Sequence, residues 1–513
     1  MQLDAHQCYA ALAARDRRFD GVFFTGVTST GIYCRPVCPS RTPTSRNCRF
    51  FASPAAAEAA SFRPCLRCRP ERAPGLAPTS DAGRVAAWAV EQIRSGTQLS
   101  PGSIEPLAAR AAQSPRHFRR LVRTTLGVSP MQLVQTTRLL IAKHLLTDTR
   151  IPIADIAFAS GFGSPRRLQA TLQARYGISP SQLRRGHGTP TGSGLMFTLE
   201  YREPLDWSKL ITFLAGRAIP GVELVDGLTY ARTWRAGPKA MPGWFRITPA
   251  PGAGRLTFEC AETLTPHIAA LIAIIRRLFD LDARPDVIAS SLAADPILAP
   301  SVLASPGLRV PGCTDGFELA WRAVLGQQVS VAAARTLSGR VVASFGEPTT
   351  TPIAGLTHIT PDTTRMASAS PKHFSTLGLT SARAACLAEL ARRAARGELP
   401  TSPPPDPAAA IAVLCECPGI GDWTAQYIAM RALRWPDAFP VGDLILRRKL
   451  ADSGATTPKA ALAHAERWRP WRAYAAMHAW NLLSLEATPT SPATKPRTKP
   501  SRTSTRKPRT ETP

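Results

Sequence analysis

A glycine turn between two helical patterns, near residue 420, constrains the fold of this chain most strongly. An apolar run ends at Leu414, Pro-Gly-Ile-Gly follows at 418–421, and a new helical pattern begins at Asp422. Proline and glycine interrupt helices, and glycine permits positive φ and close approach of a partner. The sequence therefore predicts a helix, a tight hairpin with such glycines at Gly419 and Gly421, and a second helix. The free N–H groups at the start of that helix attract an anion such as a DNA phosphate.

Asp443 follows this hairpin by about twenty residues and precedes an apolar-periodic run. An aspartate in that place is commonly a helix N-cap, and a Pro-Gly-Ile-Gly turn is commonly only a turn. The combination resembles the helix-hairpin-helix DNA glycosylase family, in which a catalytic carboxylate follows the hairpin at this distance. Members that also cleave the strand have a lysine where this chain has Trp423. The resemblance therefore implies a monofunctional glycosylase, which removes the base and leaves the strand intact.

The resemblance also implies a base pocket at Trp423, Tyr427 and Trp480. Loss of a base passes through an oxocarbenium-like sugar, which a nearby carboxylate stabilises. A purine alkylated at N3 or N7 is already cationic, so an electron-rich aromatic pocket attracts it by cation–π interaction. Plain core packing is the alternative for each ring. We expect core packing for three further tryptophans, which are Trp321, Trp468 and Trp471.

Residues 311–330 are close to the signature of the AlkA-type 3-methyladenine glycosylase, and the resemblance covers essentially all of 196–486. That family has an intercalating leucine where this chain has Gln328. A leucine fills the gap left by a flipped base, and a glutamine would fill it with less apolar surface. Family hairpins often hold a monovalent cation through backbone carbonyls, which the sequence itself does not show.

Two short cysteine pairs lie in the first 76 residues, as Cys34-x3-Cys38 and Cys65-x2-Cys68. Zinc takes four soft ligands in a tetrahedron, and two such pairs supply two ligands each. One Zn²⁺ per chain is therefore expected. A purely structural zinc is the commoner use of such a site.

The residues around these cysteines, at 24–41, 46–51 and 61–70, resemble the N-terminal domain of the Ada alkylation-response protein. In that family a zinc-bound thiolate takes a methyl group irreversibly from a methyl phosphotriester in DNA. The acceptor is the first cysteine of the first pair, Cys34 here, so the resemblance implies stoichiometric methyl transfer. The positions that match residues holding the DNA backbone are Thr30, Arg41, Arg63 and Arg67, whose alternative is solvated surface.

Two helical pairs about fifty residues apart follow a linker near residue 75, and each pair ends in Gly-x-Ser-Pro, at 127–130 and 177–180. Ser114 before Pro115 is a strong helix start. The repeat resembles the AraC-type DNA-binding domain over 81–186, with one long helix at 131–146 joining its two helix-turn-helix units. An arginine at the start of a recognition helix contacts phosphate more often than a base. The candidate DNA-contacting residues are Arg116, His117, Arg119, Arg166 and Arg167.

Periodicity changes again after 196, where alternating strands and two helices predict an α+β subdomain. The predicted fold class is multidomain and mainly α with α+β parts. The predicted domains are 1–76 (Ada-type zinc domain), 81–186 (AraC-type double helix-turn-helix domain), 187–195 (flexible linker), 196–284 (α+β subdomain), 285–486 (all-helical helix-hairpin-helix glycosylase domain) and 487–513 (disordered basic tail). The Gly/Ser/Thr composition of the linker predicts two separately folded halves that are tethered.

The charge of the chain favours a polyanionic partner. Its 63 Lys and Arg residues exceed 36 Asp and Glu residues, for a net charge of +27. The excess is spread along the chain, at +6 over 1–79, +10 over 80–186, +5 over 187–486 and +6 over 487–513. Eleven cysteines with no signal peptide or long apolar run predict a reducing cytoplasm, with the protein on the nucleoid and away from membranes.

The leading functional prediction is an alkylation-response protein that joins a damage sensor, a transcriptional activator and a base-excision enzyme. Its partners would be alkylated DNA, promoter DNA and the transcription machinery. One alternative is a regulator whose glycosylase half only clamps DNA, and another is a glycosylase whose N-terminal parts only add affinity. The chain lacks a Pro-Cys-His-Arg motif, so alkylguanine methyltransferase activity is expected to be absent.

Overall fold

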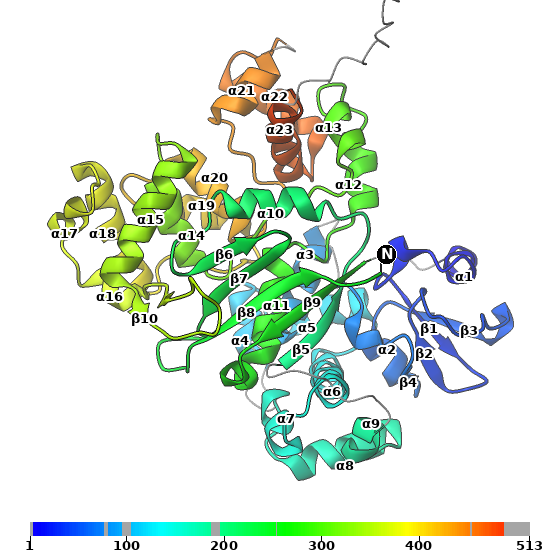
Figure 1. Ribbon diagram of the computed structural model, residues 1–513. Helices are drawn as coiled ribbons and strands as arrows, with labels where there is room; N and C mark the ends of the chain where they lie inside the picture. Colours follow the sequence, from blue (N-terminus) through cyan, green and yellow to red (C-terminus); the bar gives the residue numbers. More distant parts are fainter. Residues whose placement is uncertain are drawn as a thin grey trace, which may run out of the picture.

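The computed structural model describes residues 4–75, 81–94, 104–185, 195–252, 254–451 and 454–486. A five-stranded sheet lies at the centre of Figure 1, with the cysteine-containing region (residues 5–72) to its right and helices α6 to α9 (residues 130–185) below it. The expected tail at 487–513 and all but the last residue of the expected linker lie outside the described residues. Within the described part, no helix has the length and apolar character needed to cross a membrane.

The cysteine-containing region is a small sheet with short helices around it. Its strand order is β3-β1-β2-β4, with β2 antiparallel to β1 and parallel to β4. Ser53 starts the second helix by accepting a hydrogen bond from Ala56 N, as expected for an N-cap serine before a proline. Its elements are α1 (Ala5–Ala13), η1 (Arg17–Phe19), β1 (Phe24–Val27), β2 (Ile32–Cys34), η2 (Ser45–Asn47), β3 (Cys48–Phe51), α2 (Pro54–Ala59), β4 (Arg63–Pro64) and η3 (Pro70–Arg72).

The helix-turn-helix region contains the two predicted units joined by the predicted long helix. Ser114 caps its helix by accepting from His117 N, and Ser164 does the same from Arg167 N. Gly127 and Gly177 end these helices with positive φ, which explains the glycine in each Gly-x-Ser-Pro motif. Its helices are α3 (Asp81–Arg94), α4 (Glu105–Arg110), α5 (Pro115–Leu126), α6 (Pro130–Asp148), α7 (Ile153–Ala159), α8 (Pro165–Tyr176) and α9 (Pro180–Arg185).

The α+β subdomain is built on an antiparallel sheet of order β5-β9-β8-β7-β6. The alternating segments predicted as strands are confirmed as β5, β7, β8 and β9. The short edge strand β6 was not predicted. Leu195, assigned to the linker, already belongs to β5. Its elements are β5 (Leu195–Glu200), α10 (Trp207–Ala215), β6 (Glu223–Asp226), β7 (Thr229–Trp234), β8 (Gly243–Pro249), β9 (Arg255–Cys260), η4 (Glu262–His267) and α11 (Ile268–Leu278).

The C-terminal region is helical except for one two-stranded ribbon, β10 with β11. Its core encloses Trp321, Trp468 and Trp471, so the core interpretation of these three rings is confirmed. Its elements are α12 (Pro285–Leu292), α13 (Ala299–Ala304), α14 (Gly316–Leu325), α15 (Val331–Phe345), β10 (Glu347–Pro348), β11 (His358–Ile359), α16 (Thr363–Ala367), α17 (Pro371–Thr376), α18 (Ser381–Ala395), α19 (Pro407–Cys415), α20 (Asp422–Arg431), α21 (Leu444–Ala451), α22 (Pro458–Ala465), η5 (Glu466–Trp468) and α23 (Arg472–Glu486).

Buried arginines join the two halves of the chain, so the expectation of halves that are merely tethered is wrong. Arg202 follows β5 and donates to the backbone oxygens of Asp20 (2.9 Å) and Gly75 (2.8 Å). Arg35, next to the first zinc-motif cysteine, pairs with Asp20 and with Glu200 of β5 (2.7 Å). Such groups need partners when water is excluded, so these contacts seat the cysteine-containing region on the central sheet.

A second contact joins α3 to α11 of the α+β subdomain and to the C-terminal helical region. Trp88 Nε1 donates to Pro403 O at 2.9 Å, and Glu91 forms ion pairs with Arg277 (2.9 Å) and Arg434 (3.6 Å). A linker composition reports freedom of the linker itself, and it contains no information about surfaces elsewhere that bind each other.

The C-terminal helix α23 is fixed by a buried polar network. His478 and Asn481 contact Ser301 Oγ of α13 at 3.0 and 2.9 Å, and Lys209 of α10 donates to Asn481 Oδ1 at 3.0 Å. Burial, reinforced by Lys209, lowers the pKa of His478 from 6.5 to about 4. His478 therefore stays neutral in the folded protein at neutral pH.

Replacing His478 by glutamine should remove a pH dependence of stability. Because the pKa of His478 is lower in the folded state, the unfolded state binds the proton first as the pH falls. The free energy of unfolding of the wild type should therefore decrease between pH 6.5 and about 4, by up to ~3 kcal/mol. The advantage of wild type over His478→Gln should shrink across this window in urea unfolding followed by tryptophan fluorescence. The exposed His6→Gln variant is the control, and parallel pH profiles for wild type and His478→Gln would contradict the assignment.

Candidate functional site

Asp443 lies between two indole rings and also caps a helix. Its Oδ1 accepts from the backbone N–H groups of Ile445 (3.0 Å) and Leu446 (3.1 Å) at the start of α21. The same oxygen accepts from Trp480 Nε1 at 3.0 Å, and Oδ2 accepts from Trp423 Nε1 at 3.3 Å. The N-cap interpretation is therefore confirmed, and four N–H donors orient one half-buried carboxylate.

Two of the three aromatic residues expected in the pocket, Trp423 and Trp480, meet at this carboxylate, and Tyr427 lies against Trp423. Trp423 stacks on Tyr427 with ring centroids 5.4 Å apart and an interplanar angle of 9°, and both rings are half-buried. Arg431 Nη1 donates to Tyr427 Oη at 2.7 Å. Burial raises the pKa of Tyr427, but Arg431 and Arg217 outweigh burial and leave that pKa below its usual value. The site thus offers a stacked aromatic surface beside a fixed carboxylate.

The two hairpin glycines have different roles, which corrects the prediction of positive φ at both. Gly419 has φ +90°, and a Cβ there would lie 2.8 Å from Cys386 Cβ, so glycine is required internally. Gly421 is extended, with φ −88° and ψ 175°, and a Cβ would meet nothing within 4 Å. It is exposed and precedes α20, whose start has no side-chain cap. The N–H groups of the first turn of α20 are therefore left for another partner.

Gln328 is exposed in the turn between α14 and α15 and has φ +53°. Its neighbour Gln327 donates through Nε2 to the hairpin, at Gly419 O (2.9 Å) and Thr424 Oγ1 (3.1 Å). The sequence reading did not identify Gln327. The available signal was its place beside Gln328, but a contact across 92 positions leaves no pattern in the sequence.

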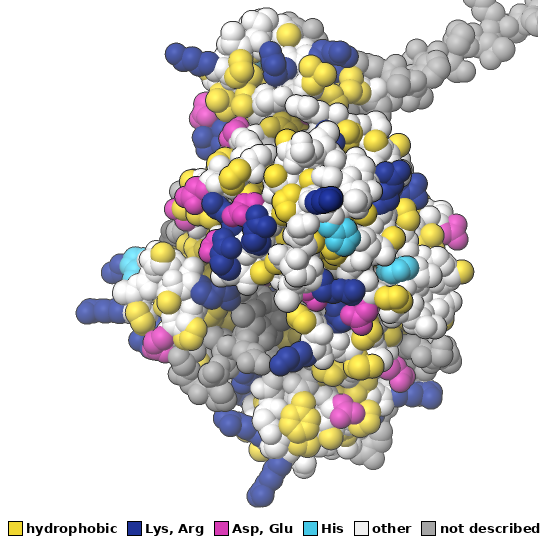
Figure 2. All heavy atoms as spheres, turned by 90° about the vertical axis from the view of Figure 1, so that its left-hand side faces the viewer, with side chains coloured by type: hydrophobic (Ala, Val, Ile, Leu, Met, Phe, Trp, Pro, Cys, Tyr) yellow, Lys and Arg dark blue, Asp and Glu magenta, His cyan; other side chains and the backbone are white. Residues whose placement is uncertain are grey.

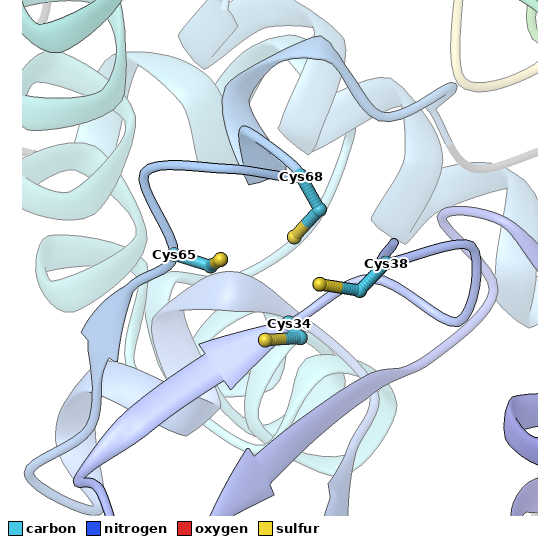
Figure 3. Close-up of side chains that lie close together, drawn as sticks. All are labelled: Cys34, Cys38, Cys65 and Cys68. Atoms are coloured by element: carbon cyan, nitrogen blue, oxygen red, sulfur yellow. The ribbon is translucent and has the colours of Figure 1, made fainter. Parts of the chain in front are cut away.

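The four predicted zinc ligands converge in space. The sulfur atoms of Cys34, Cys38, Cys65 and Cys68 all lie within 4.8 Å of one another, and Figure 3 shows them pointing toward a common centre. Tetrahedral Zn–S bonds of about 2.3 Å place sulfurs about 3.8 Å apart, so the cluster fits one Zn²⁺. None of the four forms a disulfide.

Cys34 differs from the other three cysteines because it is only half-buried. It ends β2 and borders a cavity of about 310 Å³. Three of the four cysteines line this cavity, and the fourth, Cys68, lies behind it, with its Sγ accepting from Arg35 N at 3.3 Å. The structure also brings the expected backbone-holding residues to the same cavity, which are Thr30, Arg41, Arg63 and Arg67.

The predicted DNA-contacting residues of the helix-turn-helix region are exposed at the starts of α5 and α8. Arg119 forms a 3.0 Å ion pair with Glu105, and His117 Nδ1 lies 3.0 Å from Arg120 Nη2. The exposed candidates are Arg116, His117, Arg119, Arg166 and Arg167.

On the side of the molecule that carries α17 and α18, Lys and Arg side chains are spread over the surface with Asp and Glu among them (Figure 2).

Four family models match the chain in the predicted order. The metal binding domain of Ada matches residues 7–71, and a helix-turn-helix domain matches 107–186. The AlkA N-terminal domain matches 196–315, and the HhH-GPD superfamily of base excision DNA repair proteins matches 321–473.

Three relatives are similar to this chain over nearly its whole length or over part of it. A "Probable bifunctional transcriptional activator/DNA repair enzyme AlkA" of Mycobacterium tuberculosis is 38% identical over 495 residues, which cover 94% of this chain and 97% of that protein. "DNA-3-methyladenine glycosylase 2" of Escherichia coli is 37% identical, over 56% of this chain and 96% of that protein. "Bifunctional transcriptional activator/DNA repair enzyme Ada" of Escherichia coli is 33% identical, over 35% of this chain and 49% of that protein.

Alanine at the two hairpin glycines should separate their roles. Gly419→Ala should lower the free energy of unfolding by ~1–3 kcal/mol, because it adds the cost of positive φ to a clash with buried Cys386. Gly421→Ala should change it by no more than ~0.5 kcal/mol, because its backbone is extended and its surroundings are open. Denaturant unfolding of both variants beside the wild type measures this. Equal destabilisation by the two substitutions would contradict the assignment.

Proposed function

Since this chain belongs to the family of AlkA-type bifunctional transcriptional activators and DNA repair enzymes, we propose that it excises alkylated bases at Asp443 and senses methylated DNA phosphates at Cys34. The chain is a DNA glycosylase joined to an Ada-type, DNA-binding regulator. The observation that supports the excision proposal most directly is the Asp443 carboxylate, fixed by four N–H donors beside a stacked aromatic pair.

Asp443 stabilises the sugar cation as the base departs. Breaking the C1′–N bond leaves positive charge on the sugar, and a carboxylate already held in place needs no reorganisation at that moment. The indole N–H groups of Trp423 and Trp480 fix both oxygens of Asp443. After the base has left with the electrons of the C1′–N bond, water adds to C1′ and releases a proton to solvent, which gives a free base and an abasic site.

The stacked rings of Trp423 and Tyr427 select the base. An alkylated purine with a positive charge gains cation–π attraction on an aromatic face, and an undamaged purine does not. Trp423 occupies the position of the lysine found in strand-cleaving members, and an indole forms no Schiff base. Excision without strand cleavage follows. The Asp443 carboxylate, fixed beside a stacked aromatic pair, also argues against the alternative in which this half only clamps DNA.

Cys34 accepts the methyl group at the N-terminal site. A bound Zn²⁺ would keep the four sulfurs as thiolates at neutral pH. The half-buried Cys34 sulfur faces the cavity, and its S–CH₃ bond forms as the CH₃–O bond of the phosphotriester breaks. The phosphate leaves as a diester with the electron pair. Arg41, Arg63 and Arg67 at the cavity would hold neighbouring phosphates.

Methylation of Cys34 changes the charge that DNA meets. A thiolate becomes a neutral thioether, so one negative charge disappears beside the phosphates and binding strengthens. The helix-turn-helix residues, which are Arg116, His117, Arg119, Arg166 and Arg167, would then hold promoter DNA more tightly and recruit the transcription machinery. This switch distinguishes the proposal from a glycosylase with added nonspecific affinity.

The remaining parts of the proposal follow from the same resemblance. They comprise one zinc per chain, a monovalent cation held by hairpin carbonyls, contact of Gly419 and Gly421 with DNA, and a location in the cytoplasm on the nucleoid. The proposed functional units are 1–76, 81–186, 196–284 and 285–486.

Asp443→Asn should reduce excision of 3-methyladenine by at least ~100-fold, because the sugar cation loses its counter-charge. DNA binding should be retained, because the hairpin is unchanged. The asparagine oxygen can still accept at the start of α21, so folding should persist. Base release from methylated DNA by wild type and variant measures this.

The wild-type product should be an unbroken abasic strand. Asp406→Asn, at an exposed aspartate that caps α19 as Asp443 caps α21, is the matched control and should excise normally. Borohydride trapping of a protein–DNA adduct, or full activity in Asp443→Asn, would refute this part of the proposal.

Cys34 should gain one methyl group after incubation with methylated DNA, because it alone of the four cysteines is half-buried at the cavity. Mass spectrometry of peptides should find no methyl on Cys38, Cys65 or Cys68. Promoter affinity should rise with the modification, and its salt dependence should change. An unmodified Cys34 would mean that the zinc is only structural, and methylation without a gain in affinity would refute the switch.

A further inference from the structure

The side-chain amide of Gln327 connects two separate segments of the glycosylase region. Gln327 follows the C-terminal end of α14, and its Nε2 donates to Gly419 O at 2.9 Å, in the hairpin turn. It also donates to Thr424 Oγ1 at 3.1 Å, in the first turn of α20. Both N–H bonds of the amide are therefore directed at the helix-hairpin-helix element, one on each side of Gly421.

The backbone of Gln327 is held as well, from a third element. Arg383 on α18 donates from Nη2 to Gln327 O. Cys386, one turn further along α18, packs directly under Gly419. Helix α18 is thus a common base for the turn at 326–330 and the hairpin at 417–421, and Gln327 spans the two.

Gln328, the next residue, has a backbone conformation that needs such support. Its φ of +53° is in the left-handed region, which residues other than glycine adopt rarely and mostly where neighbouring contacts over-determine it. Its side chain is exposed. On the C-terminal side, Ser330 fixes the turn by capping α15 through Ala333 N at 3.2 Å. On the other side, the contacts of Gln327 and Arg383 fix it.

We propose that Gln327 is a positioning residue for base eversion. Gln327 fixes the turn that carries Gln328 to the hairpin that binds the DNA backbone. The hairpin and Gln328, the wedge residue that would fill the space left by the flipped base, therefore move as one rigid unit. This inference rests on the proposed function. It assigns a role to a residue outside the pocket, and it explains how a polar wedge is held in an otherwise unfavourable conformation.

We therefore expect a change at Gln327 to impair eversion of the base from the helix and to leave DNA binding almost unchanged. The hairpin N–H groups contact DNA without Gln327, so affinity for DNA should depend little on its side chain. Eversion requires Gln328 to stay at a fixed place against the base stack while the backbone is held. If the turn moves independently of the hairpin, Gln328 is misplaced against the base stack. A misplacement of about 1 Å can cost about 100-fold in rate.

The test uses the full chain with Gln327→Met, which keeps the length of the side chain and removes both donors. Gln327→Glu, similar in size and without N–H donors, should behave alike. Single-turnover excision should fall about 10- to 100-fold. The eversion signal of 2-aminopurine placed beside the lesion should fall with it, while the Kd for the same DNA changes less than about threefold. Thr424→Val removes one of the two bonds and should give an intermediate loss, which keeps the test valid if Gln327→Met folds poorly.

A double-mutant cycle with Gln328→Ala distinguishes positioning from general damage. If Gln327 acts through Gln328, the double variant should be little worse than Gln328→Ala alone. Gln135→Met, at an exposed glutamine of α6 whose side chain accepts from Arg175, controls for the replacement itself. The inference would be overturned if the losses of the two single variants multiply in the double variant. Unchanged 2-aminopurine fluorescence in Gln327→Met, or a loss of DNA affinity as large as the loss of excision, would overturn it too. Absence of excision by the wild type would instead refute the proposed function, and the fluorescence arm would still measure eversion.

Discussion

The hydrogen bonds to Asp443 link the helices that form the repair site. One carboxylate accepts from the start of α21 and from indole groups on α20 and α23. A carboxylate that must satisfy several fixed donors has little freedom, so the three helices are placed relative to one another by the same group that carries the proposed chemistry. The buried network of His478, Asn481 and Ser301 secures α23 from behind and thereby secures Trp480. Stability and chemistry at this site therefore depend on overlapping contacts.

The cysteine-containing region is connected to both of its neighbours through buried polar groups. Tyr33, which precedes Cys34, donates to the buried carboxylate of Glu58 at 3.1 Å, and Tyr176 at the end of α8 donates to the same carboxylate at 2.8 Å. Burial raises the pKa of Glu58, although three hydroxyl donors, the third from Thr136, favour its charged form. On the opposite side, Arg35 reaches the repair half through Glu200. The residues that flank the proposed methyl acceptor thus contact both the helix-turn-helix region and the glycosylase region.

Local patterns predicted most of the elements because the relevant information is local. The two Ser-Pro helix starts and the Gly-x-Ser-Pro ends follow from capping and positive φ, and they appear as predicted at α5 and α8. The four cysteines could be grouped because soft ligands in two short pairs have few other uses. The edge strand β6 was missed because four residues carry little periodicity. Gly421 was misjudged because glycine composition does not reveal whether the reason for a glycine is its own φ or an external partner.

The sequence by itself determined the order of the functional parts, the grouping of four cysteines that fit one zinc ion, and the pairing of a glycine hairpin with Asp443, since each is a short-range pattern of residue types. Only the tertiary structure decided that Asp443 is both a helix cap and an acceptor for two indoles, that Cys34 is the least buried of the four cysteines, and that the two halves are joined through Arg202 and Arg35. Gln327 belongs to this second group. Contacts between residues tens to hundreds of positions apart depend on how helices and sheets pack, and packing leaves no fixed spacing in the chain.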